Sequence, residues 1–160
     1  MEDKRGNIWL AVSGLVINDE GKCLVVKKSY SATKGLWTLP SGFVQADETI
    51  DAAVAREVRE ETGLLVEPEA VVAMRSGVLR KGKHDTLLVF RARLLGGTET
   101  RCERELLTID WLTPEEIAAS PDSTEFLATL IRDVHHIEGL KPRPFQHTRD
   151  YGYSEFKIFF

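Results

Sequence analysis

The stretch GFVQADETIDAAVAREVREETGL, residues 42–64, determines the fold expected for this chain. From Thr49 to Thr62 its apolar residues recur at helical spacing, and Gly63 follows at the position that a helix C-cap favours. Thr49 suits the N-cap position, and Asp51 lies in the first turn, where a negative charge interacts favourably with the helix dipole. We therefore predict a helix over residues 49–62.

Three glutamates share one face of this predicted helix. At about 100° per residue, Glu57, Glu60 and Glu61 fall within an arc of roughly 100°. Their charges repel one another unless a cation lies among them, and oxygen ligands select Mg²⁺ or Mn²⁺ over zinc. Apolar residues occupy the adjoining arc, which places the acidic face beside the buried seam. For these three residues taken alone, a solvated acidic helix face remains the simpler interpretation.

The spacing around the glutamates is more specific than the glutamates themselves. Gly42 is followed after five residues by Glu48, and after seven more by the run REVREETGL, residues 56–64. For average residue usage, a chance match at one starting point is on the order of one in a billion. The stretch resembles the signature of the Nudix hydrolases and matches all nine of its defined positions.

The resemblance implies a role for each matching residue. Glu57, Glu60 and Glu61 correspond to ligands of a divalent metal, Mg²⁺ or Mn²⁺, and Glu57 also to a general base or an orienter of the attacking water. Gly42 corresponds to the glycine whose backbone carbonyl reaches the metal, where a side chain would obstruct close approach. Arg56 corresponds to the arginine that holds the catalytic glutamate.

Two acids outside the helix extend the expected site. Glu48 corresponds to the glutamate that fixes the arginine. Many family members add an acid from the loop before a late strand, and Glu105 is preferred to Glu103 for this role. The alternative is a loop glutamate paired with Arg101 or Arg104. The expected catalytic set is Arg56, Glu57, Glu60 and Glu105.

The resemblance also implies the reaction. Nudix hydrolases cleave a nucleoside diphosphate linked to another group, by attack of water on phosphorus at the anhydride. Mg²⁺ would neutralise the phosphate oxygens and lower the pKa of its bound water while a carboxylate takes the proton. We expect a pyrophosphohydrolase acting on a nucleoside triphosphate or a nucleotide sugar. Candidate assisting cations, each individually expected to be plain surface charge, are Lys27, Lys28, Arg75, Arg80 and Lys83.

Two alternatives belong to other functional classes. A catalytically silent Nudix domain would serve as a nucleotide sensor or a protein-interaction module. Such domains usually lose glutamates of the signature segment, here residues 42–64 and called the box below, whereas this chain retains them. Action on capped or triphosphorylated RNA would require a basic groove. The 21 Lys and Arg residues against 25 Asp and Glu residues give a net charge of −4, which makes a nucleic-acid partner unlikely and favours a small nucleotide.

The rest of the chain predicts a mixed α/β domain. Apolar and β-branched segments predict strands over residues 8–17, 23–28, 71–79, 86–95 and 106–112, the first two forming one hairpin and the next two another. Helices are expected over residues 115–119 and 123–137. With the helix of the box, this order is similar to the Nudix α/β/α sandwich with a mixed β-sheet, over residues 1–138.

Residues 139–160 form an aromatic tail. Five aromatic residues lie within its last ten positions, which seldom stay in solvent: Tyr151, Tyr153, Phe156, Phe159 and Phe160. We expect the tail to pack as a strand on its own domain or on a partner in a homodimer. Stacking on a substrate base is the less favoured alternative.

Composition sets the cellular context that we expect. At 160 residues, with 42% apolar and 29% charged residues, the chain has the size and balance of one globular domain. Its polar first residues lack the apolar core of a signal peptide, and no apolar stretch approaches the roughly 18 residues of a membrane span. The two cysteines have no paired spacing. We expect a cytoplasmic protein with no membrane partner.

Overall fold

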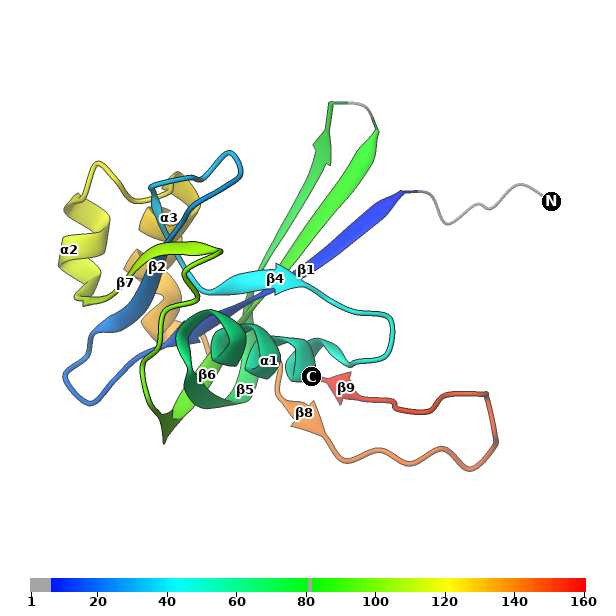
Figure 1. The fold of residues 1–160 in the computed structure, drawn as a ribbon. Coiled ribbons are helices and arrows are strands. Elements are labelled where there is room, and N and C mark those ends of the chain that lie inside the picture. The colour runs from blue at the N-terminus through cyan, green and yellow to red at the C-terminus, as the bar shows by residue number, and fades with distance from the viewer. Residues whose placement is uncertain (1–6, 81) are drawn as a thin grey trace.

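Helices separate runs of consecutive strands along the chain, and a mixed sheet lies at the centre of the fold (Figure 1). The computed structural model describes residues 7–80 and 82–160, so part of the predicted domain, residues 1–6, and Lys81 of the predicted hairpin turn lie outside the described residues. The strands are β1 (Ile8–Val16), β2 (Cys23–Lys28), β3 (Trp37–Thr38), β4 (Ser41–Phe43), β5 (Leu64–Leu79), β6 (Lys83–Gly97), β7 (Leu106–Leu112), β8 (Pro142–Arg143) and β9 (Ile158–Phe159). The helices are α1 (Ile50–Thr62), α2 (Pro114–Ala119) and α3 (Glu125–Asp133), with a 3₁₀ turn η1 (Val134–His136).

The main sheet has the strand order β4-β1-β6-β5. β1 and β6 run parallel, whereas β4 on one side and β5 on the other are antiparallel to their neighbours. A smaller sheet has the order β3-β2-β7. The fold is therefore the mixed α/β arrangement that the sequence predicts.

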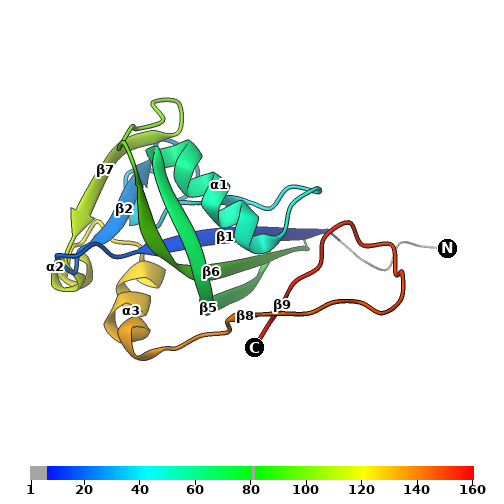
Figure 2. The ribbon, with the colours of Figure 1, turned by 90° about the horizontal axis from the view of Figure 1, so that it is seen from below.

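The alternation of side chains along the strands divides the core into two layers. Leu15 of β1 and Val89 of β6 pack in the cluster that includes residues of α2 and α3. Val16 and Phe90, their neighbours in sequence, pack in the second cluster with residues of α1. Figure 2 shows α1 and α3 on opposite faces of the sheet, which confirms the α/β/α sandwich.

α1 begins and ends where the sequence predicts. Gly63 adopts φ +75°, and its N–H donates to the carbonyl of Arg59. A Cβ at Gly63 would lie 2.3 Å from the carbonyl oxygen of Thr98, so close approach as well as the positive φ requires glycine. Thr49 occupies the N-cap position with extended backbone, but its side chain makes no capping hydrogen bond.

The predicted first hairpin is wrong beyond its tip. β1 and β2 belong to different sheets and are joined by the single bridge of Ile17 with Cys23. Both hydrogen-bonding edges of β1 are taken by β4 and β6, so β2 pairs with β3 and β7 instead. The second predicted hairpin, β5–β6, is confirmed, because these two strands pair antiparallel along their whole length.

Other boundaries differ in ways that have local causes. β5 starts at Leu64 and continues through Pro68, where a register shift in the ladder accommodates the proline. The last predicted helix is shorter, because α3 ends at Asp133 and the chain tightens into the 3₁₀ turn η1. Within residues 7–80 and 82–160, none of the helices combines the length and the hydropathy that a membrane span requires.

The tail returns to the domain beside α1 (Figures 1 and 2). β8 pairs with β9, and Phe159 meets Phe90 edge-on at 5.7 Å between ring centroids. Lys157 pairs with Asp51 in the first turn of α1. The tail thus contacts the helix that carries the box glutamates, whereas its contact with a second copy of the chain stays a prediction.

Candidate active site

Gly42 and Glu57 lie in direct contact between β4 and α1. A Cβ built on Gly42 would lie 2.2 Å from the carboxyl carbon of Glu57, a distance that no side chain tolerates. The missing side chain therefore lets the Glu57 carboxylate rest against the backbone of β4. Burial raises the pKa of Glu57, and the hydrogen bond from Arg56 partly opposes this shift. A carboxylate in this setting is better suited to accept a proton than one in open water.

Arg56 connects three acids. Its Nε and Nη2 donate to the two carboxylate oxygens of Glu48 at 2.9 and 2.7 Å, a bidentate pair that lowers the pKa of Glu48. Its Nη1 donates to Glu57 at 2.7 Å and to Glu60 at 3.0 Å. The hydrogen bond with Glu48 is the largest cause of the raised pKa of Arg56. The guanidinium is thereby fixed, and it fixes the Glu57 carboxylate in turn.

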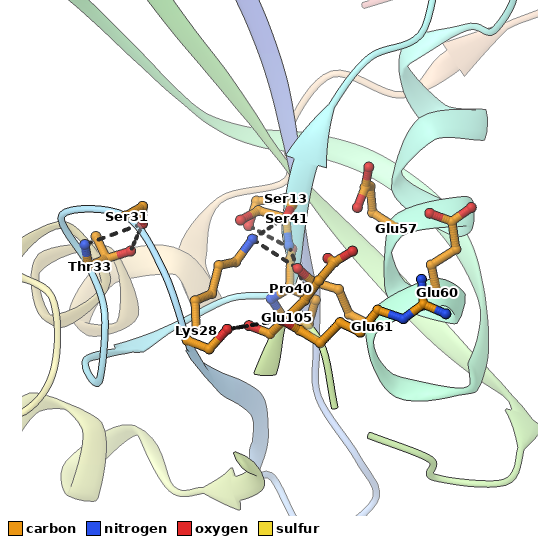
Figure 3. A network of polar contacts seen from close by, with 12 residues as sticks. Ser13, Lys28, Ser31, Thr33, Pro40, Ser41, Glu57, Glu60, Glu61 and Glu105 are labelled. Atoms are coloured by element: carbon orange, nitrogen blue, oxygen red, sulfur yellow. Dashed lines mark hydrogen bonds and ion pairs between the residues drawn. The ribbon is translucent and has the colours of Figure 1, made fainter. Parts of the chain in front are cut away.

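Glu61 and Lys28 form a buried ion pair across the site (Figure 3). Glu61 has no exposed surface and Lys28 is only 7% exposed, with 2.8 Å between Lys28 Nζ and Glu61 Oε1. Glu61 Oε2 accepts the N–H of Ser41 at 3.1 Å, and Lys28 Nζ donates to the carbonyl of Ser41 at 2.5 Å. Burial raises the pKa of Glu61 despite the adjacent lysine.

The three glutamates do not converge on one point. Glu60 is half exposed and turned to Arg56, whereas Glu61 is turned to Lys28. Within residues 7–80 and 82–160, no group of three or more His, Cys, Asp or Glu side chains is arranged to hold a metal ion. The carboxylates are neutralised by the side chains of Arg56 and Lys28 instead.

The two loop glutamates have different surroundings. Glu103 points to solvent, with its side chain 84% exposed and 3.7 Å from Arg101. Glu105 lies next to Lys28, because β2 and β7 pair Lys28 with Leu106. Burial raises the pKa of Tyr30, and the charge of Glu105 raises it further. Glu105 therefore lies beside the site, near Lys28 and Glu61 (Figure 3).

A cavity of about 480 Å³ extends from Lys28 and Gly42 across the face of the main sheet. Its walls are largely apolar, and its aromatic lining consists of Trp9, Tyr30, Phe43 and Phe126. The cavity joins the acidic end of the site to the β5–β6 hairpin, where Arg75 and Asp85 line it. Such an elongated pocket, with polar groups at its two ends, suits a ligand with a flat ring and a charged group.

The sequence indicated the acids and Lys28 as one of five candidate cations, but the expectation of plain surface charge for Lys28 is wrong. Among the cations expected at the surface, Lys27 pairs with Asp122, whereas Lys28 is buried in the ion pair with Glu61. The aromatic lining was also missed. The alternation of Trp9, Ala11 and Ser13 along β1 would have been its signal, because residues two apart share one face of a strand.

Known proteins are similar to this chain in sequence and in fold. Residues 8–134 match the NUDIX domain family. A "MutT-like protein" of Streptomyces ambofaciens is 37% identical over 109 residues, which cover 68% of this chain and 66% of that protein. An "ADP-ribose pyrophosphatase" of Methanocaldococcus jannaschii is 36% identical over 89 residues, 55% of this chain and 52% of that protein.

A solved structure extends the likeness to three dimensions. The "MutT protein" of Methanosarcina mazei Go1 has a TM-score of 0.71 and 25% identity, over 82% of this chain and 96% of that chain. This chain spans less than two thirds of the length of the two relatives matched by sequence. The domain match, the relatives and the shared fold agree: the chain belongs to the Nudix family.

Proposed function

We propose that this chain is a Mg²⁺-dependent Nudix pyrophosphohydrolase, which cleaves the phosphoric anhydride of a nucleoside triphosphate or a nucleotide sugar. The contact of Gly42 with the Glu57 carboxylate carries the proposal. It brings the backbone of β4 and the largely buried carboxylate of Glu57 together beside a cavity. The name of one relative, an ADP-ribose pyrophosphatase, supports the same reaction class.

The chemistry of the donor set suits a hard divalent ion, although Glu60 and Glu61 are turned to Arg56 and Lys28 in this structure. Glu57, Glu60 and Glu61 on α1 and the carbonyl of Gly42 offer oxygen ligands only, as Mg²⁺ and Mn²⁺ prefer. Glu61 Oε1 is buried and accepts no well-formed hydrogen bond, although Lys28 Nζ lies near it. When bound, the ion would supply charge neutralisation of the phosphate oxygens and a water of lowered pKa.

The residues of the chain supply positioning and proton transfer. Glu57, whose pKa is raised by burial, takes the proton of the attacking water. Arg56 holds the Glu57 carboxylate and is itself held by Glu48. Lys28 lines the cavity, and its ammonium group would bind a phosphate oxygen; Glu105 is a further candidate base beside it.

The partner of this chain would be a small nucleotide, not a nucleic acid or a membrane. The chain would act in the cytoplasm. The acidic net charge of −4 supports a nucleotide partner, because a nucleotide is held through metal and local cations and does not need a basic surface. A homodimer stays a prediction from the aromatic tail.

The test is a panel of nucleoside triphosphates and nucleotide sugars with Mg²⁺. We expect turnover by the wild type and a loss of at least about 100-fold in kcat for Glu57→Gln and Glu60→Gln with unchanged circular dichroism. Glu103→Gln is the matched control, because Glu103 points to solvent. Equal turnover in all four proteins would contradict the site, and tight nucleotide binding without turnover would favour the sensor.

A further inference from the structure

The cavity beside the acidic site has a second polar end. The residues at this end indicate which nucleotide base the cavity accepts. The inference rests on the proposed function, which places the phosphates at the Lys28 and Gly42 end. The opposite end lies on the β5–β6 hairpin, where Arg75 and Asp85 line the cavity. Between the two ends the lining is chiefly apolar and aromatic, as a flat base requires for stacking.

The floor of the cavity is one face of the main sheet. Trp9, Ala11 and Ser13 alternate along β1, and the register places Asp85 opposite Trp9 and Leu87 opposite Ala11. Since Trp9 and Ser13 are four residues apart on one strand, the two ends of the floor are separated by about 13 Å. A nucleoside with its first phosphate spans this length, so a base reaches the hairpin when the phosphates lie at Lys28.

Arg75 and Asp85 form an ion pair at this end of the cavity. Arg75 Nη2 donates to Asp85 Oδ2 at 2.9 Å, and the Arg75 guanidinium lies 5.5 Å from the ring centroid of Phe126. The Asp85 side chain is 21% exposed and the Arg75 side chain 44% exposed, and both residues line the cavity. The pair thus presents guanidinium donors next to a carboxylate acceptor.

We propose that the Arg75–Asp85 pair selects a guanine base. Guanine carries the O6 acceptor beside the N1–H and N2–H donors along one edge, so Arg75 donates to O6 while Asp85 accepts both N–H groups. Adenine and cytosine present one amino donor beside acceptors, and uracil presents one N–H between two carbonyls. Guanine alone among these bases offers the carboxylate two adjacent donors.

The test compares kcat/KM for GTP, ITP, ATP, CTP and UTP with Mg²⁺. Inosine lacks the N2 amino group of guanine, so ITP removes one hydrogen bond to Asp85 and nothing else. We expect kcat/KM for GTP to exceed that for ITP about 10-fold and that for ATP about 100-fold. Asp85→Asn should bring the ratio of GTP to ITP close to one.

Glu67→Gln is the matched control. Glu67 pairs with Arg93 across the same hairpin, β5–β6, but does not line the cavity. Glu67→Gln should therefore leave the ratio of kcat/KM for GTP to that for ITP unchanged. Equal kcat/KM for all five nucleotides, or an unchanged ratio in Asp85→Asn, would overturn the inference while leaving the proposed function intact. If no nucleotide is hydrolysed, the proposed function fails, and the dissociation constants of α,β-methylene GTP and α,β-methylene ATP decide the base preference. Weaker binding of the adenine analogue would support the inference and equal binding would overturn it.

Discussion

Replacing Lys28 with methionine should destabilise the fold through the charge that it leaves behind. Glu61 has no exposed surface and Lys28 is 7% exposed, so Lys28→Met leaves a buried carboxylate without its cation. Removal of one partner of a buried ion pair costs about 3–5 kcal/mol. Because the N–H of Ser41 still donates to Glu61 at 3.1 Å, we expect the lower part of that range, about 3–4 kcal/mol.

The loss should depend on pH. Burial raises the pKa of Glu61 in the folded chain above its unfolded value, so the native state holds the proton more tightly than the unfolded state. Without Lys28 this shift increases, and the variant should gain stability as the pH falls from 7.5 toward 5. Glu61→Gln in the Lys28→Met background should restore part of the loss, since no charge is then buried.

Urea unfolding followed by tryptophan fluorescence, in EDTA, measures these free energies at both pH values. The double variant closes a double-mutant cycle, and we expect a coupling of at least about 1.5 kcal/mol between Lys28 and Glu61. A loss below about 1 kcal/mol that is the same at pH 7.5 and pH 5 would refute the reasoning, because the pair would then act as an exposed one.

Three further substitutions test separate contacts. Gly42→Ala places a methyl group 2.2 Å from the Glu57 carboxyl carbon and should lower kcat about 100-fold or more, measured by steady-state kinetics with circular dichroism as the check of folding. Arg56→Lys loses the bidentate bond to Glu48 and should lower kcat about 10–100-fold, and an unchanged kcat would show that the guanidinium geometry is irrelevant. Gly63→Ala forces a side chain into φ +75° and should cost at least about 1–2 kcal/mol of unfolding free energy, visible as a lower Tm, with no effect expected if that backbone conformation is not occupied.

The helix of the box was predictable because its signals are local. Apolar spacing, an acid in the first turn and Gly63 at the end determine α1 without reference to the rest of the chain. The pairing of β1 could not be predicted in the same way, because the strands that pair with β1 lie far away in sequence. β4 and β6 occupy the edges of β1, and nothing within residues 8–28 encodes that competition.

The acids of the site were predictable from their spacing, whereas their cationic partners were only partly so. The resemblance implied that Arg56 links Glu48 and Glu57, and Arg56 forms ion pairs with both of these acids. The catalytic roles of the three residues stay predictions. Lys28 was among the candidate cations, but its burial could not be recognised, because that burial depends on Ser41 and Glu61, which approach it from other elements. The CLVVKK segment does not indicate which of its two lysines turns inward.

Hydrolysis in ¹⁸O-labelled water tests the central claim most directly. With Mg²⁺ and either GTP or ADP-ribose, we predict one ¹⁸O atom in a phosphate group of a product, because water attacks phosphorus at the anhydride, and loss of this label in EDTA and in Glu57→Gln. Mass spectrometry locates the label. Label in the sugar, or the same rate of labelled phosphate with and without Glu57, would contradict the account.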